Sequence, residues 1–214
     1  MYVLMLDTET TNNLESPIVY DCGFCVLDLE TGNIVEKHSY VLAEVFLDAD
    51  LMSTAYFAEK IPSYWEDIKE GKRKLVKIAT CKRIMEEVVK KYNICYLVAH
   101  NAGFDYRATQ GTQRYMTSSK HRFFLPYGVK IVDTLKMARK KFGKDSDYGE
   151  FCYNNDHLTS RGVRRYTAEV LYKYLSNNPN FEEAHTGAED CLIEAQILLA
   201  CLQTMEIEDG VLWA

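Results

Sequence analysis

The sequence lacks the features that mark membrane-spanning, exported or low-complexity chains. It has only four prolines in 214 residues, and no segment is dominated by one or two residue types. No apolar run approaches the ~20 residues that a membrane-spanning helix needs. The N-terminal segment MYVLML has no basic stretch before it, so we expect neither a signal peptide nor a membrane span.

A disulfide framework is also missing, because the seven cysteines are odd in number and scattered. Cys22 and Cys25 have the C-x-x-C spacing of zinc ligands, but no second pair stands at zinc spacing. Apolar residues surround both, so we interpret them as buried core thiols. The expected compartment is therefore a reducing one, the cytoplasm.

An excess of positive charge is absent too, since the formal net charge is −6. This balance argues against a protein that coats nucleic acid, because such binding depends on Lys and Arg neutralising phosphates. It remains compatible with an enzyme whose carboxylate cluster binds divalent cations, which supply positive charge locally.

What the chain does have is an ordinary globular composition, 47% hydrophobic and 26% charged. Its length fits one core, which extends to roughly 250 residues, so we expect a single domain over 1–214. The apolar patterns and turn signals predict about five strands alternating with helices. Strands are expected at 1–7, 18–29, 34–42, 94–99 and 129–134, and helices at 78–92, 104–118, 134–142, 164–176 and 187–204. This order favours an α/β fold, a mixed sheet with helices on both faces. Residues 143–163 are expected to be a loop, and 46–77 a long insertion.

Carboxylates follow the first apolar strand. Asp7 and Glu9 are two residues apart, so a strand points both to one side. Two carboxylates leaving a buried strand are costly unless they bind a cation, and Mg²⁺ and Mn²⁺ prefer such oxygen ligands. Taken alone, this common motif is explained more simply by a solvated strand end followed by a Thr/Asn loop.

A second motif, His100 to Asp105, follows the apolar run 94–99. Ligands of open α/β sheets collect at the carboxyl ends of strands. We expect Gly103 to permit the sharp turn, and the helix dipole favours Asp105 in a first turn. The alternative is a simple helix cap.

The third motif runs from His185 to Asp190 and opens the last long helix. Thr186 and Glu189 have capping-box spacing, which leaves His185 on a mobile segment just before the helix and Asp190 in its first turn. A capped helix with an incidental histidine is the alternative.

Together, D-x-E, N-x-x-F-D and H-x-x-x-x-D resemble the DEDDh branch of the DnaQ-like 3′–5′ exonucleases, within the ribonuclease H-like superfamily. The order of the motifs, their contexts and the segment 132–139 carry the resemblance over nearly the whole chain. The tyrosine branch needs Tyr-x-x-x-Asp, and none of Tyr166, Tyr172 or Tyr174 has an aspartate four residues later.

The resemblance implies a ribonuclease H-like sheet and a two-metal phosphodiester hydrolase that releases nucleoside 5′-monophosphates. Two Mg²⁺ or Mn²⁺ ions would be held by four carboxylates, with His185 as the general base. The backbone of Thr10 and Thr11, with Asn101 and Phe104, would contact or support the substrate. The Gly-apolar pair that often follows the family's first motif is replaced by Thr11-Asn12-Asn13-Leu14, which puts terminal-nucleotide recognition in doubt. The ligand set comprises Asp7, Glu9, Asp105 and Asp190.

The implied partner is a nucleic-acid 3′ end, with single-stranded or frayed DNA favoured and RNA as the close rival. Basic groups at 69–77, 136–144 and 161–165 would guide phosphates or be solvated faces. Tyr64 and Trp65 would stack on bases if exposed. A non-catalytic module of a polymerase or repair complex usually lacks a ligand, and none is missing here, although a polymerase or repair partner stays open. The remaining alternative is an unrelated α/β domain with coincidental carboxylates.

Overall fold

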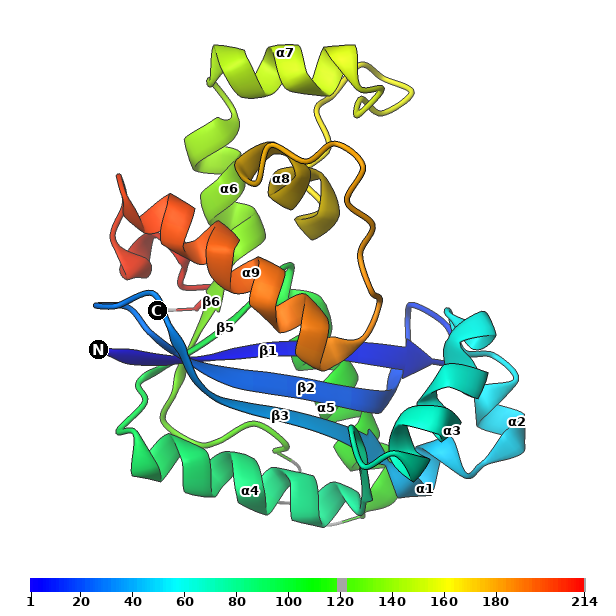
Figure 1. The fold of residues 1–214 in the computed structure, drawn as a ribbon. Helices are drawn as coiled ribbons and strands as arrows, with labels where there is room; N and C mark the ends of the chain where they lie inside the picture. Colours follow the sequence, from blue (N-terminus) through cyan, green and yellow to red (C-terminus); the bar gives the residue numbers. More distant parts are fainter. Residues whose placement is uncertain (119–122, 214) are drawn as a thin grey trace.

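A computed structural model describes residues 1–118 and 123–213. Its centre is a six-stranded sheet in the order β4-β3-β2-β1-β5-β6 (Figure 1). The strands are β1 (Tyr2–Thr11), β2 (Ile18–Asp28), β3 (Ile34–Leu42), β4 (Lys74–Val76), β5 (Tyr96–Ala99) and β6 (Lys130–Asp133).

The pairing confirms the expected mixed sheet. β1 pairs with β2 and β2 with β3 in antiparallel fashion, whereas β5 is parallel to both β1 and β6. The fourth strand, β4, was not predicted; it runs parallel to β3 inside the segment 46–77. It has three residues and no buried one, so its sequence carries no apolar alternation.

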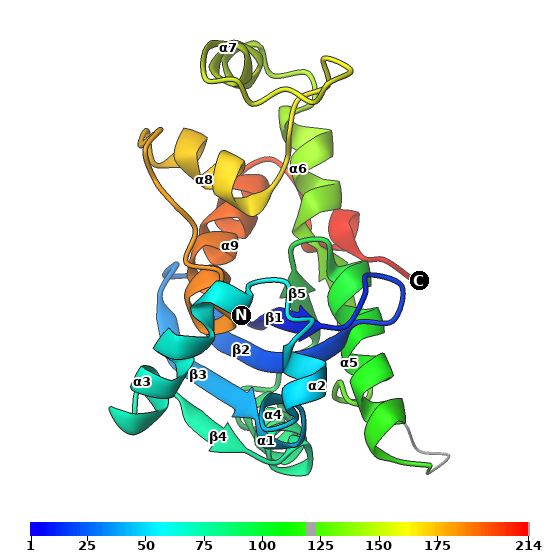
Figure 2. The ribbon, with the colours of Figure 1, turned by 90° about the vertical axis from the view of Figure 1, so that its right-hand side faces the viewer.

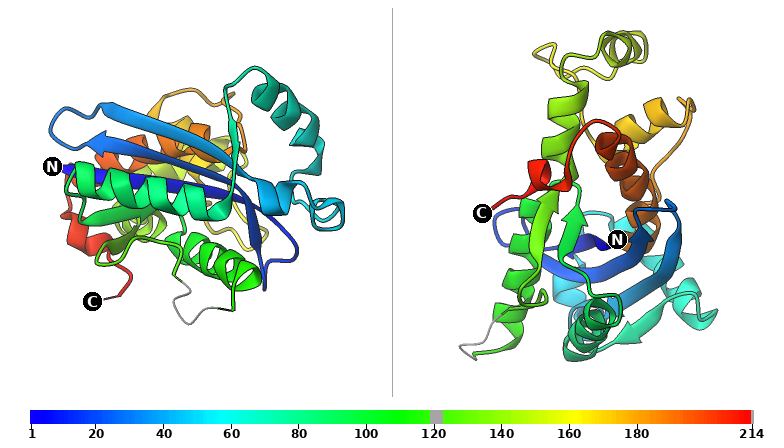
Figure 3. Two further views of the ribbon diagram at one scale, coloured as in Figure 1. Left: turned by 90° about the horizontal axis from the view of Figure 1, so that it is seen from below. Right: turned by 90° about the vertical axis from the view of Figure 1, so that its left-hand side faces the viewer.

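Apolar residues of β1 alternate between two cores, one on each face of the sheet. Leu4 and Leu6 pack on the side of α4 (Ile78–Lys91) and α5 (Ala102–Met116). Val3 and Met5 pack on the side of α6 (Thr134–Phe142), α8 (Ala168–Leu175) and α9 (Gly187–Leu202). Figures 2 and 3 show these two helical layers with the sheet between them. Because side chains alternate along a strand, Asp7 is expected to face the same layer as Val3 and Met5.

The shorter elements lie at the edges of this sandwich. The segment after β3 forms α1 (Ala43–Phe46), α2 (Ala49–Met52), η1 (Ala58–Lys60) and α3 (Ile61–Lys69), beyond the tips of β1 to β3 (Figure 1). A last 3₁₀ turn, η2 (Ile207–Gly210), follows α9. None of the helices in the described ranges is long and apolar enough to cross a membrane.

The expectation of a loop over 143–163 is wrong, because α7 (Ser146–Asn154) lies within it. The Asp145 side chain caps this helix by accepting a hydrogen bond from the Tyr148 backbone N–H at 3.0 Å. Tyr148 and Cys152, one turn apart, are its buried residues. This stripe is too short to be recognised among the polar residues around it. The core-thiol interpretation holds, since Cys22 and Cys25 are both free and buried.

Two glycines bring the start of α9 against the backbone of β2. A Cβ on Gly23 would lie 2.0 Å from the Ala188 nitrogen, and one on Gly187 would lie 2.7 Å from the Asp7 carbonyl oxygen. Only glycine at both positions permits this approach. As a result, the first turn of α9 lies directly beside the carboxyl end of β1.

Candidate active site

Asp7 and Glu9 stand near the carboxyl end of β1, on the side of α9. Val3 and Met5 face this side, and the alternation of a strand points Asp7 and Glu9 the same way. The register of β1 with β2 shifts between Glu9 and Thr10, an irregularity of the kind that re-aims side chains next to active sites. Asp7 is half-buried and Glu9 is buried.

Asp105 enters from the other helical layer, in the first turn of α5. It is 3% exposed, and its Oδ1 accepts a hydrogen bond from the Thr8 hydroxyl at 2.7 Å. The sharp turn before α5 is made by Asn101, whose φ is 66°, and not by Gly103 as expected. Asparagine is among the few residues that tolerate this left-handed conformation. Asp133 fixes the turn by accepting from the Asn101 N–H at 2.9 Å.

Asp190 lies in the first turn of α9 and is 4% exposed. Its Oδ2 accepts a hydrogen bond from the Thr186 N–H at 2.8 Å. The predicted capping box does not form, because the Thr186 hydroxyl donates to Glu189 Oε2 at 2.6 Å and no side-chain cap closes the helix. Glu189 is drawn instead towards Arg73, 2.9 Å away. The start of α9 is therefore held by side chains of another segment.

His185 comes close to two of the carboxylates. Donor atoms of Glu9, His185 and Asp190 all lie within 4.8 Å of one another. The His185 backbone has a φ of 53°, an uncommon conformation for a residue other than glycine. Its ring stacks on Phe57, with centroids 4.1 Å apart and planes 12° apart. Partial burial lowers the pKa of His185, which favours the neutral imidazole that a general base requires.

The four carboxyl groups of the motifs influence one another through their charges. Burial is the largest cause in each case, and it raises the pKa of Glu9 to about 9 and those of Asp105 and Asp190 to about 7. The pKa of Asp7 also lies well above its usual value, through burial and then repulsion from neighbouring carboxylates. Among residues 1–118 and 123–213, no Lys or Arg forms an ion pair with these four. The cluster therefore carries uncompensated negative charge whenever it ionises.

Two further carboxylates, Glu183 and Glu194, lie outside the predicted ligand set and join the cluster. Glu194 is 3% exposed and is the largest charged contributor to the raised pKa of Asp7. Its Oε2 accepts a hydrogen bond from the His100 N–H at 3.2 Å. Glu183 has its pKa raised to about 8, by burial and then by the charge of Asp190. A signal for Glu194 existed: it lies one helical turn after Asp190, as a charged residue in the apolar stripe of α9.

A cavity of about 450 Å³ opens beside Glu9. Three of the residues predicted to contact substrate line it: Thr10, Asn101 and Phe104. Its apolar walls come from Leu14, Tyr56, Phe57 and Phe104. Thr11 does not line it; its side chain is 1% exposed and its hydroxyl meets the Thr54 hydroxyl at 2.8 Å. Of the two aromatic residues singled out for stacking, Tyr64 is buried at 1% exposure and Trp65 is 39% exposed.

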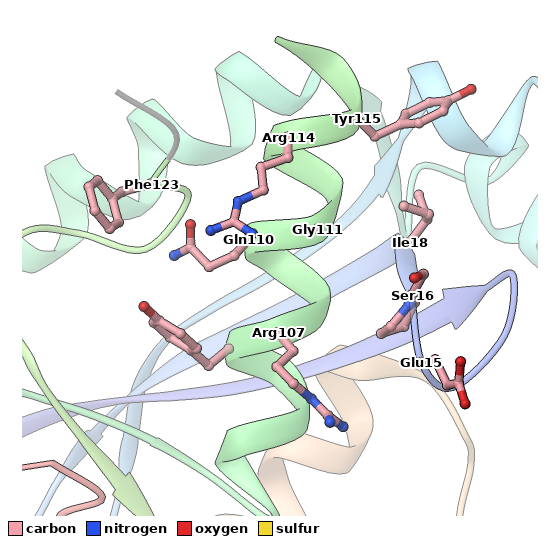
Figure 4. Close-up of a pocket in the computed structure, with 11 residues that line it drawn as sticks. Glu15, Ser16, Ile18, Arg107, Gln110, Gly111, Arg114, Tyr115 and Phe123 are labelled. Atoms are coloured by element: carbon pink, nitrogen blue, oxygen red, sulfur yellow. The ribbon is translucent and has the colours of Figure 1, made fainter. Parts of the chain in front are cut away.

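Two larger grooves adjoin this cavity. One, of about 710 Å³, contains Asp7, Glu183 and Glu194 together with Arg139 and Arg165. The other, of about 740 Å³, follows α5. Figure 4 shows Arg107, Gln110 and Arg114 along this second groove, and Arg107 also lines the cavity beside Glu9.

The donor set fits hard divalent cations. Carboxylate oxygens are the ligands that Mg²⁺ and Mn²⁺ prefer, and here several are buried together without a protein cation. Burying such charges is costly unless a partner compensates them. A bound divalent cation would supply that compensation and lower the pKa of each ligand. The chemistry of these donors therefore agrees with a metal centre.

The fold is similar to that of several solved 3′-exonuclease structures. No protein-family model matches the sequence, and no curated protein sequence matches it. A structure described as exonuclease X in complex with 5′ overhanging duplex DNA has a TM-score of 0.55 and 19% identity, with 98% of this chain and 97% of that chain covered. The nuclease domain of 3′hExo, a DEDDh family member bound to rAMP, has a TM-score of 0.63 and 10% identity, covering 94% and 92%. A 3′-exonuclease recognising a histone mRNA stem-loop has a TM-score of 0.59 and 11% identity, covering 94% and 81%. The chain has the ribonuclease H-like fold of these DEDDh 3′-exonucleases. Of those proteins, one is described in complex with duplex DNA and another as recognising an mRNA stem-loop.

Proposed function

We propose that this chain is a metal-dependent 3′–5′ exonuclease that releases nucleoside 5′-monophosphates. The observation that carries the proposal is the meeting of the three motifs at one end of β1. Carboxylates from β1, α5 and α9 lie close enough for their charges to raise the pKa of Asp7. A donor atom of His185 lies within 4.8 Å of those of Glu9 and Asp190. The fold comparison supports the same reading but does not by itself assign an activity.

Asp7, Glu9, Asp105 and Asp190 would hold two Mg²⁺ or Mn²⁺ ions. When bound, the ions would activate a water molecule and stabilise the leaving 3′-oxygen of the phosphodiester. The protein contributes a rigid frame, since Asp105 is fixed by Thr8 and Asp190 by the Thr186 N–H. Fixed ligands matter because a catalytic group displaced by 1 Å costs about a hundredfold in rate.

His185 would accept the proton from the attacking water. A neutral imidazole is needed for this step, and the lowered pKa of His185 favours it near neutral pH. Glu183 Oε2 lies 3.9 Å from His185 Nδ1, so the ionised form of this carboxyl group would stabilise the ring once it gains the proton.

The cavity beside Glu9 would take the 3′-terminal nucleotide. Its volume, about 450 Å³, lies in the range of pockets that enclose small molecules. Phe104 and Tyr56 offer apolar and aromatic faces to a base, and stacking of this kind contributes ~1–3 kcal/mol per base. These contacts read no base edge, so we expect little preference for the sequence of the substrate. They favour a single-stranded or frayed end, whose last base is free to unstack.

The test uses one oligonucleotide labelled at either end. Single-stranded DNA, duplex DNA and RNA of one sequence are incubated with Mg²⁺, Mn²⁺ or EDTA. We expect metal-dependent shortening from the 3′ end, fastest on single-stranded DNA. Asp7→Ala should abolish it, and His185→Ala should slow it about 10²–10⁴-fold, the contribution of general-base catalysis. Faster shortening of RNA would move the assignment to an exoribonuclease. Degradation in EDTA would overturn the metal mechanism.

A further inference from the structure

The segment 46–77 is attached to the end of β1 by its own backbone and side chains. The Tyr56 N–H donates to the Thr10 carbonyl oxygen at 3.3 Å, and the hydroxyls of Thr54 and Thr11 lie 2.8 Å apart. In Figure 1 the helices of this segment stand beyond the tips of the first strands, beside the start of α9. It therefore contacts both β1, which carries the first motif, and the start of α9, which carries the third.

Arg73 is the most deeply buried charge of this segment. It is 6% exposed and pairs with Glu189 Oε2 at 2.9 Å, Asp67 Oδ2 at 2.9 Å and Asp21 Oδ2 at 3.3 Å. Its guanidinium also lies 4.7 Å from the centre of the Tyr64 ring. The basic group at 69–77 is a candidate phosphate contact by its sequence, but Arg73 is buried and pairs with three carboxylates.

Asp21 links Arg73 to Gly187, the first residue of α9. It is completely buried, and its Oδ2 accepts from the Tyr64 hydroxyl at 2.6 Å and from the Gly187 N–H at 3.1 Å. Glu189, the other partner of Arg73, accepts from the Thr186 hydroxyl. Through Asp21 and Glu189, Arg73 is thus connected to Gly187 and Thr186, in the turn that precedes Asp190.

Phe57 provides a separate contact to the histidine. Its ring stacks on His185 at 4.1 Å, although the backbone of His185 is in the uncommon left-handed conformation. Such conformations persist only where surrounding contacts determine them. Stacking on Phe57 is one such contact, and it is made by the imidazole ring that lies near Glu9.

We propose that the segment 46–77 is a clamp that positions the third motif, with Arg73 setting the place of Asp190 and Phe57 that of His185. Both are positioning residues, since each acts through another side chain. The segment thereby has a role that its sequence alone does not indicate. It rests on the proposed function in naming Asp190 as a metal ligand and His185 as a base.

The Arg73 part is tested without nucleic acid, in Arg73→Lys and Glu189→Gln. Lysine keeps the positive charge of Arg73 but not its fork of hydrogen-bond donors. Glu189→Gln removes the negative charge of the partly exposed partner of Arg73. Amide hydrogen exchange at 184–190 should rise about tenfold while exchange in β1 and β2 stays unchanged. Mn²⁺ affinity, measured by calorimetry, should fall about tenfold, as when groups that orient a metal ligand are lost. The control is Lys72→Ala, which removes an exposed ion pair with Glu70 beside Arg73.

Two results would overturn this part. One is unchanged exchange at 184–190 with Mn²⁺ affinity within twofold of the unaltered protein. The other is faster exchange across the whole sheet, which would make Arg73 a residue that only stabilises the fold. Because neither measurement involves cleavage, both remain decisive if the chain proves not to be a nuclease.

The Phe57 part is tested by comparing Phe57→Ala with Tyr56→Ala. Both residues line the cavity beside Glu9, so both substitutions should raise KM. Only Phe57→Ala should also lower kcat, by about tenfold, and change the acidic limb of the pH–rate profile, because only Phe57 holds the His185 ring. Phe57→Tyr should restore kcat. Equal kcat values in the two alanine variants would contradict the assignment.

Discussion

Gly23→Ala should disable the site without touching any proposed catalytic residue. The new Cβ would lie 2.0 Å from the Ala188 nitrogen, whereas ordinary contacts between heavy atoms begin at about 3.5 Å. The start of α9 must therefore move away from β2 by at least about 1 Å, and Asp190 would move with it. Overpacking of this size costs ~1–3 kcal/mol of stability, and the displaced ligand should lower kcat about a hundredfold.

Thermal unfolding, Mn²⁺ calorimetry and single-nucleotide release measure these effects separately. The matched control is Gly103→Ala, a glycine in α5 with no atom within 4 Å of the added Cβ. That variant should be active and ~0.5–1 kcal/mol more stable, the usual difference between alanine and glycine in a helix. A Gly23→Ala protein with kcat and Mn²⁺ affinity within twofold of the unaltered chain would refute the reasoning.

In EDTA, the free energy of unfolding should fall as the pH rises from about 5 to about 9. The folded chain keeps protons on Glu9 and Asp190, whose pKa values are about 9 and about 7. The unfolded chain releases the same protons near pH 4, so each pH step in this range favours unfolding. Scanning fluorimetry should show this fall, reduced in Glu9→Gln and removed by saturating Mn²⁺; a melting temperature that rises over this range in EDTA would contradict it. Glu194→Gln should raise the melting temperature of the metal-free protein at pH 8, by removing one buried repulsion, and weaken Mn²⁺ binding about tenfold. Unchanged calorimetry and melting would exclude Glu194 from the centre. Arg114→Ala should make the salt dependence of binding to single-stranded DNA shallower by about 0.7 in log–log slope. Arg83→Ala should leave the slope unchanged, because Arg83 is already ion-paired with Glu87 on α4.

Much of the fold was predictable because its core elements have strong periodic patterns. The helix expected at 134–142 is α6 to the residue, and the apolar runs ending at Asp7 and at Ala99 are strands. The sequence does not predict β4 and α7 because both are short; β4 has no buried residue and α7 has only Tyr148 and Cys152. Such elements are defined by their neighbours rather than by their own sequence.

The chemistry-bearing motifs were visible in the sequence, but their surroundings were not. The turn at Asn101 and the partner of Glu189 depend on Asp133 and Arg73, which are 32 and 116 residues away in the chain. Local rules assigned the turn to Gly103 and the side chain of Glu189 to a capping box, because they take no account of distant partners. For Glu194 the local signal, a charge within the apolar stripe of α9, indicates burial, but its proximity to Asp7 follows only from the packing of α9 on the sheet.

The most direct test of the central claim is the release of 5′-mononucleotides from a 3′ end by the unaltered chain and by Asp7→Asn. This substitution keeps the shape of the side chain and removes its charge. The account predicts Mg²⁺-dependent release by the unaltered chain, with Asp7→Asn slower by at least about a hundredfold although folded. Equal release by the two proteins, or none by the unaltered chain with Mg²⁺ or Mn²⁺ on either DNA or RNA, would contradict it.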